Sequence, residues 1–186
     1  LGLLEQVIEQ VARLIAKLQS LGFIHGVMNT DNMLITGETI DYGPCAFMDT
    51  FKQATVYSAI DQQGRYAYQN QPAIAHWNLM TLAQALLPLL HDNEDTAIEQ
   101  AKATLQTFPD RFDDHYNAHS AVKLGLTPSK VSRALFAEFL ALLETHELDF
   151  TNSFSGLAGR LESNAPLLAT DDWQQWMAQW HAALQD

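Results

Sequence analysis

A short polar segment that begins with histidine, followed by an acidic turn, constrains this chain more than any other feature. The segment covers residues 25–32, and the turn begins at Asp41. Residues 33–40 between them form two short β-prone runs around Gly37, which predicts a tight hairpin. With the turn centred near Gly37, residue 33 faces about residue 41, and paired strands lie roughly 5 Å apart. The polar groups at the mouth of the hairpin are therefore expected to converge.

Three oxygen-bearing side chains lie at this mouth: Asp31, Asn32 and Asp41. Oxygen ligands suit a hard divalent cation, Mg²⁺ or Mn²⁺, which keeps open positions for water and for substrate phosphates. A single Asp or Asn beside a turn is more often explained by a hydrogen bond to the local backbone. Three such residues around one hairpin favour a metal and nucleotide site.

The order of these parts matches the catalytic half of protein kinases: a helix, a loop that starts with His and carries Asn, a hairpin, and then Asp-aromatic-Gly. Asn32 stands where kinases have their metal-binding Asn, and Asp41 stands where they have the Asp of Asp-Phe-Gly. The catalytic Asp of kinases and the Arg before it are replaced here by Val27 and Gly26. Asp31 is the only nearby residue that can replace the missing base.

With this departure, the run resembles the selenoprotein O family, kinase-fold proteins identified as protein adenylyltransferases. The resemblance is specific from about residue 20 to about residue 90 and looser beyond. Besides the segments above, it is carried by residues 61–68, 70–74, 76–79, 82–86 and 149–154.

The resemblance implies a mainly α fold, the C-terminal lobe of a protein-kinase-like fold, with a short β-hairpin that carries the metal site. It implies that Asp31 is the catalytic base, while Asn32 and Asp41 hold the Mg²⁺ or Mn²⁺ ion that bridges the phosphates of ATP. Family members bind ATP in a flipped orientation, so that AMP moves to a Ser, Thr or Tyr hydroxyl of a protein substrate.

Two alternatives to adenylyl transfer stay open at this point. The first is a phosphotransferase that acts on small molecules or proteins, although Val27 stands where such enzymes place their Asp. The second is a catalytically inactive pseudokinase that binds a nucleotide and serves as an interaction module.

Length and composition predict a single domain over residues 1–186, because 186 residues with 47% hydrophobic content can bury a substantial core. A kinase-like enzyme also needs an upstream lobe with a Gly-rich loop and a phosphate-binding Lys, yet the catalytic loop begins at His25. We therefore expect a fragment of a longer protein that lacks its N-lobe and a C-terminal tail and is inactive in isolation.

Charge and cysteine content limit the expected partners and location. A net charge of −12, from 22 acidic and 10 basic residues, disfavours a nucleic-acid partner. No apolar run approaches the roughly 20 residues that a membrane span needs, so no membrane partner is expected. The single cysteine, Cys45, cannot form an internal disulfide, which fits a reducing, cytoplasmic location of the bacterial type.

Apolar spacing and capping residues predict the remaining secondary structure. An amphipathic helix over residues 4–18 should end near Gly22, and a Leu- and Ala-rich helix over residues 74–90, disturbed by Pro88, should form a buried spine. Residues 44–72 between them are predicted to be a long ordered loop. Five further helices are predicted over residues 94–107, 111–123, 128–146, 152–163 and 171–185.

Two groups of residues outside this segment have competing interpretations. His115 and His119, four residues apart on a predicted helix, have a spacing that can bind zinc, but a solvated acidic face is the better interpretation. The second group has the spacing of a helix packing stripe rather than of a ligand platform, and consists of Trp173, Trp176 and Trp180.

His25 and Arg65 are expected to support the site. A histidine at the start of such a loop most often orients it through hydrogen bonds to the backbone. Arg65 can either steady a phosphate or pair with one of the many carboxylates.

Overall fold

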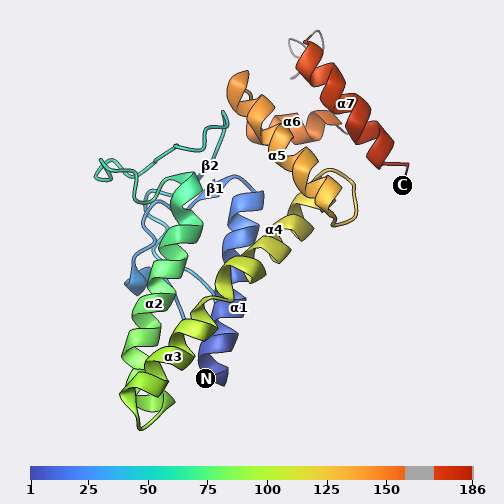
Figure 1. Cartoon of the computed structure of the whole chain (residues 1–186). Coiled ribbons are helices and arrows are strands. Elements are labelled where there is room, and N and C mark those ends of the chain that lie inside the picture. Colours follow the sequence, from blue (N-terminus) through green and yellow to red (C-terminus); the bar gives the residue numbers. More distant parts are fainter. Residues whose placement is uncertain (158–169, 186) are drawn as a thin grey trace.

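The structure, a computed structural model, describes residues 1–157 and 170–185. This described part is mainly α-helical, as predicted, and carries one small antiparallel sheet (Figure 1). In the sheet, β1 (Phe23–Ile24) pairs with β2 (Ala46–Phe47). The helices are α1 (Gly2–Ser20), α2 (Gln71–Leu90), α3 (Glu94–Leu105), α4 (Phe108–Lys123), α5 (Lys130–Thr145), α6 (Phe150–Leu157) and α7 (Asp171–Ala183).

The helix boundaries lie within a few residues of the predicted ones. α1 ends at Ser20, just before Gly22, and α5 begins behind a capping box in which Ser129 and Ser132 bond each other's backbone. The helix predicted over residues 152–163 is present from Phe150 to Leu157, and the rest of that prediction lies outside the described residues.

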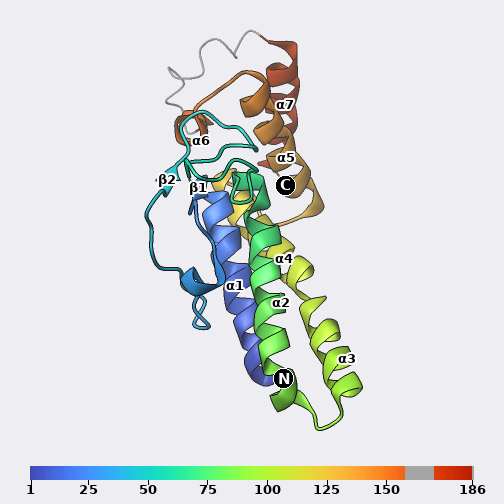
Figure 2. The ribbon, with the colours of Figure 1, turned by 90° about the vertical axis from the view of Figure 1, so that its left-hand side faces the viewer.

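The core has two parts at opposite ends of the molecule, joined by α4 (Figures 1 and 2). At the N-terminal end, aliphatic side chains of α1, α2 and α3 pack together. At the other end, α5, α6 and α7 enclose an aromatic cluster. The fully buried members of the two parts include Leu4, Ile8 and Ile15 in the first, and Phe136, Phe139, Phe150 and Trp173 in the second.

The tryptophan stripe of α7 packs into this aromatic cluster, which confirms the predicted role. Trp173, Trp176 and Trp180 are all buried. Two of their indole nitrogens bond backbone carbonyls: Trp176 Nε1 donates to Leu135 O at 2.9 Å, and Trp180 Nε1 donates to Leu124 O at 2.8 Å. The third indole nitrogen, Trp173 Nε1, is buried without a hydrogen-bond partner among the described residues, so apolar packing holds all three rings and hydrogen bonds fix two of them.

The tight hairpin predicted over residues 33–40 is present in a minimal form. A single isolated bridge joins Met33 to Thr39, and no further strand pairing follows. The turn is pressed onto α1, so that a Cβ added at Gly37 would lie 2.3 Å from the Cβ of Gln10. Leu34 N donates to Glu38 O at 2.9 Å and Ile40 N donates to Asn32 O at 3.1 Å, so the two runs lie side by side over these few residues.

α2 is only partly the buried spine that the sequence predicted. Ala75 and Leu79, on the side that faces α1, are buried, whereas Trp77 is 45% and Met80 is 50% exposed. The helix runs through Pro88 and ends at Leu90, the predicted last residue. The helix therefore has one packed side and one apolar side that the described residues leave open.

The segment Tyr68–Leu90 is long and apolar enough to cross a membrane by length and composition alone, which the sequence analysis did not predict. Helices in the cores of soluble proteins meet the same criterion. Buried polar contacts tie α2 into this core: Gln71 Nε2 donates to Gln19 Oε1 at 2.7 Å, and Asn78 Nδ2 donates to Met28 O at 3.0 Å. These contacts give α2 the role of a core helix.

Residues 48–67 are an ordered loop, as predicted. The loop is joined to the start of α6, because Phe51 N donates to Leu148 O at 2.8 Å and Phe150 N donates to Asp49 O at 2.7 Å. The loop thereby links the small sheet to the aromatic end of the molecule.

Candidate functional site

His25 is the fully buried anchor of the site. Its backbone N donates to Gln71 Oε1 at 3.0 Å, at the start of α2. Its ring contacts two backbone groups: Nδ1 accepts from Val27 N at 3.3 Å, and Nε2 lies 3.1 Å from Ile40 O. These partners select the neutral imidazole with its proton on Nε2. His25 therefore orients its loop through backbone hydrogen bonds, as predicted.

The surroundings of His25 also favour the neutral ring. Burial lowers the pKa of His25, while the carbonyl of Ile40 and the carboxylate of Asp41 act in the opposite direction. The ring of Tyr42 lies against the imidazole, with 5.1 Å between the ring centroids. His25 thus connects the first polar segment to the acidic turn that begins at Asp41.

Asn32 is 6% exposed, and both its side chain and its backbone are held. Its Nδ2 donates to Val27 O at 2.9 Å, which fixes the amide and leaves the side-chain oxygen as the group able to bind a cation. Its backbone O accepts from Ile40 N at 3.1 Å. The second bond joins the loop directly to the residue that precedes Asp41.

Asp41 is exposed and has a φ of +58°, a left-handed conformation that is uncommon for residues other than glycine. The preceding residue, Ile40, is held from two sides, through its N by Asn32 and through its O by His25. Strained backbone that is fixed by its surroundings is common at functional sites. The structure therefore holds the backbone of Asn32 next to the residue that precedes Asp41, and a shared cation site of the two side chains stays a prediction.

Asp31 lies exposed on the 3₁₀ turn Thr30–Asn32. The pairing beside it differs by two residues from the predicted register, because Met33 pairs with Thr39 rather than with residue 41. If the Met33–Thr39 pairing is extended by two residues on each side, residue 31 lies opposite residue 41. The three candidate residues therefore lie at one end of the same turn.

Gly26 and Val27 occupy the two positions where kinases have Arg and Asp. Gly26 has a φ of +87°, and a Cβ added there would lie 2.9 Å from Pro44 O, so a side chain would collide with the segment that follows Asp41. Val27 contributes backbone groups, which bond His25 and Asn32. Neither residue supplies an acid or a base.

Two contacts that sequence reasoning missed join the loop of residues 48–67 to the site. The hydroxyl of Tyr66 donates to Asn29 Oδ1. The guanidinium of Arg65 lies over the ring of Trp77, 4.8 Å from its centroid, a cation–π contact in place of the expected phosphate or carboxylate. The adjacent arginine and tyrosine were the only sequence signal for these two contacts, because nothing in their spacing links them to Asn29 or Trp77.

His115 and His119 do not form a zinc site. His115 Nε2 lies 2.7 Å from Glu9 Oε1, and Arg111 Nη1 bonds the other carboxylate oxygen of Glu9 at 2.8 Å. Burial and the neighbouring cations lower the pKa of His119. Among the residues that the structure describes, no group of three or more His, Cys, Asp or Glu side chains is arranged to hold a metal ion. Any cation site at the turn therefore rests on its two carboxylates and one amide.

Residues 2–186 match the protein adenylyltransferase SelO family. A protein nucleotidyltransferase YdiU of Geobacillus kaustophilus is 49% identical over 185 residues, which cover 99% of this chain and 38% of that relative. The protein of the same name from Anoxybacillus flavithermus is 54% identical over 156 residues, 83% of this chain and 32% of the relative. The one from Mycolicibacterium smegmatis is 48% identical over 185 residues, 98% of this chain and 38% of the relative.

These relatives are much longer than this chain, which spans about 38% of the length of those that it matches almost completely. The match to the family nevertheless extends over nearly all of the 186 residues. The chain therefore belongs to the protein adenylyltransferase SelO family.

Proposed function

We propose that this chain is the metal-binding part of a protein adenylyltransferase, which transfers AMP from ATP to a Ser, Thr or Tyr hydroxyl of a protein substrate. Family membership and relatives named nucleotidyltransferases support the reaction class. The observation that supports the proposal is the double attachment of Ile40, which holds the backbone of Asn32 beside the residue that precedes Asp41. In this proposal the chain is the C-terminal lobe of a kinase-like fold, and the rest of the full-length protein completes the nucleotide site.

Asn32 and Asp41 fit a hard divalent cation. Both offer oxygen, one from an amide that is fixed by Val27 and one from a carboxylate beside the anchored Ile40. The chain carries a net charge of −12, so an anionic nucleotide needs a cation to approach it. A Mg²⁺ or Mn²⁺ ion bound there would neutralise charge on the phosphates of ATP.

Asp31 is proposed as the general base. Its exposed carboxylate lies one residue before Asn32, and Val27 leaves no acid at the position that kinases use. As the substrate hydroxyl oxygen bonds to the α-phosphorus, its proton passes to Asp31. The bond between the α-phosphorus and the bridging oxygen breaks, and pyrophosphate leaves.

The test uses the full-length protein with Mg²⁺ or Mn²⁺ and with ATP labelled at the α-phosphate or, separately, at the γ-phosphate. We expect label on protein from the α-phosphate only. Asp41→Asn keeps the size of the side chain but removes its charge, and it should abolish the labelling. Asp92→Asn, in an exposed turn after α2, is the matched control and should label normally.

Each other pattern contradicts the proposal. Transfer of the γ-label alone would support a phosphotransferase. No transfer of either label, with Mg²⁺-ATP binding retained in calorimetry, would support a pseudokinase. Full labelling by the Asp41→Asn variant would show that Asp41 is not part of the site.

A further inference from the structure

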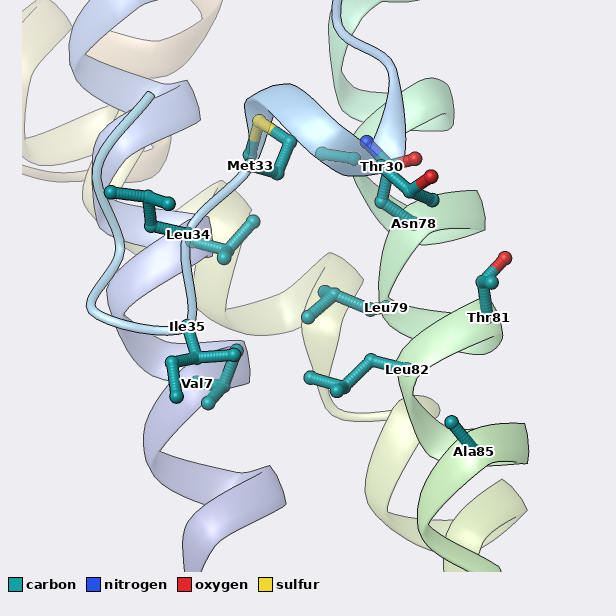
Figure 3. A pocket seen from close by; sticks show the side chains of 12 residues that line it. Val7, Thr30, Met33, Leu34, Ile35, Asn78, Leu79, Thr81, Leu82 and Ala85 are labelled. Atoms are coloured by element: carbon teal, nitrogen blue, oxygen red, sulfur yellow. The ribbon is translucent and has the colours of Figure 1, made fainter. Parts of the chain in front are cut away.

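An apolar groove of about 260 Å³ lies between α1 and α2, next to the candidate site (Figure 3). Val7 of α1 and Leu79 and Leu82 of α2 point into the same space from opposite sides. The turn that carries Met33 forms the upper boundary of the groove, and Thr30 lies at that end. This end of the groove therefore lies next to the 3₁₀ turn that contains Asp31 and Asn32.

The rim of the groove leaves apolar side chains in contact with solvent. Ile35 is 58% and Leu34 is 36% exposed, and both line the groove. On the α2 side, only 28% of the apolar window within Tyr68–Leu90 is buried. Contiguous exposed apolar surface of this kind marks an interaction site, because its contact with water is unfavourable.

Asn78 adds a specific polar requirement to this apolar groove. The residue is 7% exposed and lies at the end of the groove beside Thr30 (Figure 3). Its Nδ2 donates to Met28 O, but its Oδ1 is buried and has no hydrogen-bond partner among the described residues. A buried acceptor without a donor is unfavourable, because it has lost its hydrogen bonds to water. An occupant of the groove that brings an N–H or O–H group to this end would remove that cost.

We propose that, in the full-length protein, an apolar segment of the same polypeptide from outside residues 1–186 fills this groove and donates a hydrogen bond to Asn78 Oδ1. The groove then belongs to the internal packing of the complete enzyme. A segment bound in the groove would also pack against the turn that carries Met33 and support it.

Two observations favour the same polypeptide over a separate partner. This chain covers 38% of the relatives that it matches along almost its whole length, so most of the polypeptide of such a protein lies outside it. Most of the exposed large apolar side chains of the described residues also lie within residues 1–90, and Leu34 and Ile35 of this set line the groove. Large apolar surfaces are characteristic of permanent contacts, whereas transient interfaces are more polar.

The experiment measures the accessibility of single cysteines in the full-length protein. Ile35→Cys reports on the groove, and Val131→Cys on α5 is a matched control, because the two original side chains are both 58% exposed. Cys45→Ser removes the one cysteine of this region. Each variant is treated with a maleimide, and peptide mass spectrometry follows each cysteine separately. Rates are normalised to the same variant unfolded in guanidinium chloride.

We expect Ile35→Cys to react roughly tenfold or more slowly than Val131→Cys, as for a site that is exposed only by local opening. Ala85→Cys, an exposed position on the α2 side of the groove, should be protected in the same way if Ile35→Cys disturbs the turn. Val122→Cys, at a position that is 74% exposed on α4, serves as a second control.

Equal rates at the groove and control positions would overturn the proposal. Protection that disappears on dilution, together with a fall in the mass measured by light scattering, would assign the groove to a second copy and overturn it as well. Because the readout is not activity, failure of this proposal is distinguishable from failure of the proposed reaction.

Discussion

The two ends of the molecule bury their side chains to different extents. At the end formed by α5, α6 and α7, aromatic rings pack against one another and the indoles of Trp176 and Trp180 bond backbone carbonyls. At the end formed by α1 and α2, the core is aliphatic, a groove is left between the helices, and the loops of the candidate site lie exposed. The comparison suggests that the first end contributes mainly stability and the second mainly chemistry and contacts.

The end formed by α1 and α2 is called here the open end, and the end formed by α5, α6 and α7 the closed end. Both carry local costs, since the closed end holds Glu147 at a φ of +51° and buries Trp173 Nε1 without a hydrogen-bond partner among the described residues. At the open end, the corresponding features lie beside the candidate site. Asp41 has a left-handed backbone, and Asn78 Oδ1 is buried without a partner. Features of this kind persist when the surrounding structure holds them in place, and they are common where a protein acts on a ligand. Mutations at the two ends should therefore separate activity from stability.

The largest expected effect is the loss of transfer in Asp31→Asn of the full-length protein. Because the side chain is exposed, the free energy of unfolding should change by less than about 0.5 kcal/mol. Loss of a general base should lower the rate of adenylyl transfer by roughly 10²–10⁴-fold. Transfer of the α-label and denaturant unfolding measure the two quantities on the same preparation.

Asp114→Asn, at an exposed position on α4, is the control for Asp31→Asn and should leave both quantities unchanged. A normal transfer rate in Asp31→Asn would show that this carboxylate is not the base.

Phe139→Ala should give the opposite pattern, because Phe139 is fully buried at the closed end. Its ring lies 4.7 Å from Trp176 and 4.9 Å from Phe154, between ring centroids. Removal of a buried Phe side chain costs about 3–5 kcal/mol of unfolding free energy. Urea unfolding followed by tryptophan fluorescence measures the loss. Val131→Ala, at an exposed position on α5, should cost less than about 0.5 kcal/mol, and equal losses would refute the aromatic cluster as a source of stability.

Gly26→Ala tests how much the close packing of Gly26 against Pro44 contributes to stability at the open end. The positive φ of Gly26 costs an alanine about 1–2 kcal/mol, and the added Cβ would also meet Pro44. Gly43→Ala is a matched control within the same site, since a Cβ there meets nothing within 4 Å and no positive φ is required. Denaturant unfolding should show a clear loss for the first variant and little change for the second. Similar values for both would mean that the segment around Pro44 moves aside freely.

Much of this architecture follows from the sequence. The apolar spacing of α1 predicted a helix with Leu4, Ile8 and Ile15 on its buried side, and those residues are fully buried. Local capping chemistry and the tryptophan spacing likewise determined α5 and α7. The short turn that places the backbone of Asn32 beside Ile40 was also expected, because the β-prone runs flank Gly37.

The unpredicted features depend on long-range contacts. Gln71 joins His25 to Gln19 through its amide, and no local pattern marks that residue as different from other glutamines. The tip of the turn over residues 33–40 packs on α1 at Gln10, a contact that local β propensity does not contain. The exposed side of α2 depends on what covers it, which periodicity alone cannot show.

Acidification should weaken the open end through His25. Burial lowers the pKa of His25 below that of an unfolded chain, about 6.5, so the unfolded state binds a proton at a higher pH. The stabilisation is complete above pH 6.5 and is lost as the pH falls from there through the lowered pKa. His119 has a lowered pKa as well and acts in the same direction.

Unfolding measured between about pH 8 and pH 5 should therefore show a decrease in stability that is smaller in His25→Gln and, separately, in His119→Gln. The comparison uses the slope with pH, because His25→Gln also changes the stability at every pH. An unchanged slope in His25→Gln would mean that folding does not shift the pKa of His25 and would contradict this prediction.

The smallest expected effect concerns Glu9 of α1, which bonds Arg111 and His115 of α4, the helix that joins the two ends. The three side chains are about one-third exposed, so solvent screens the pairs and Glu9→Gln should cost only about 0.2–1 kcal/mol, less at high salt. Glu5→Gln, at an exposed position on α1, is the control. We expect apolar packing to hold α1 against α4. A salt-sensitive loss of unfolding free energy above about 2 kcal/mol would show instead that the ion pairs of Glu9 hold the two helices together.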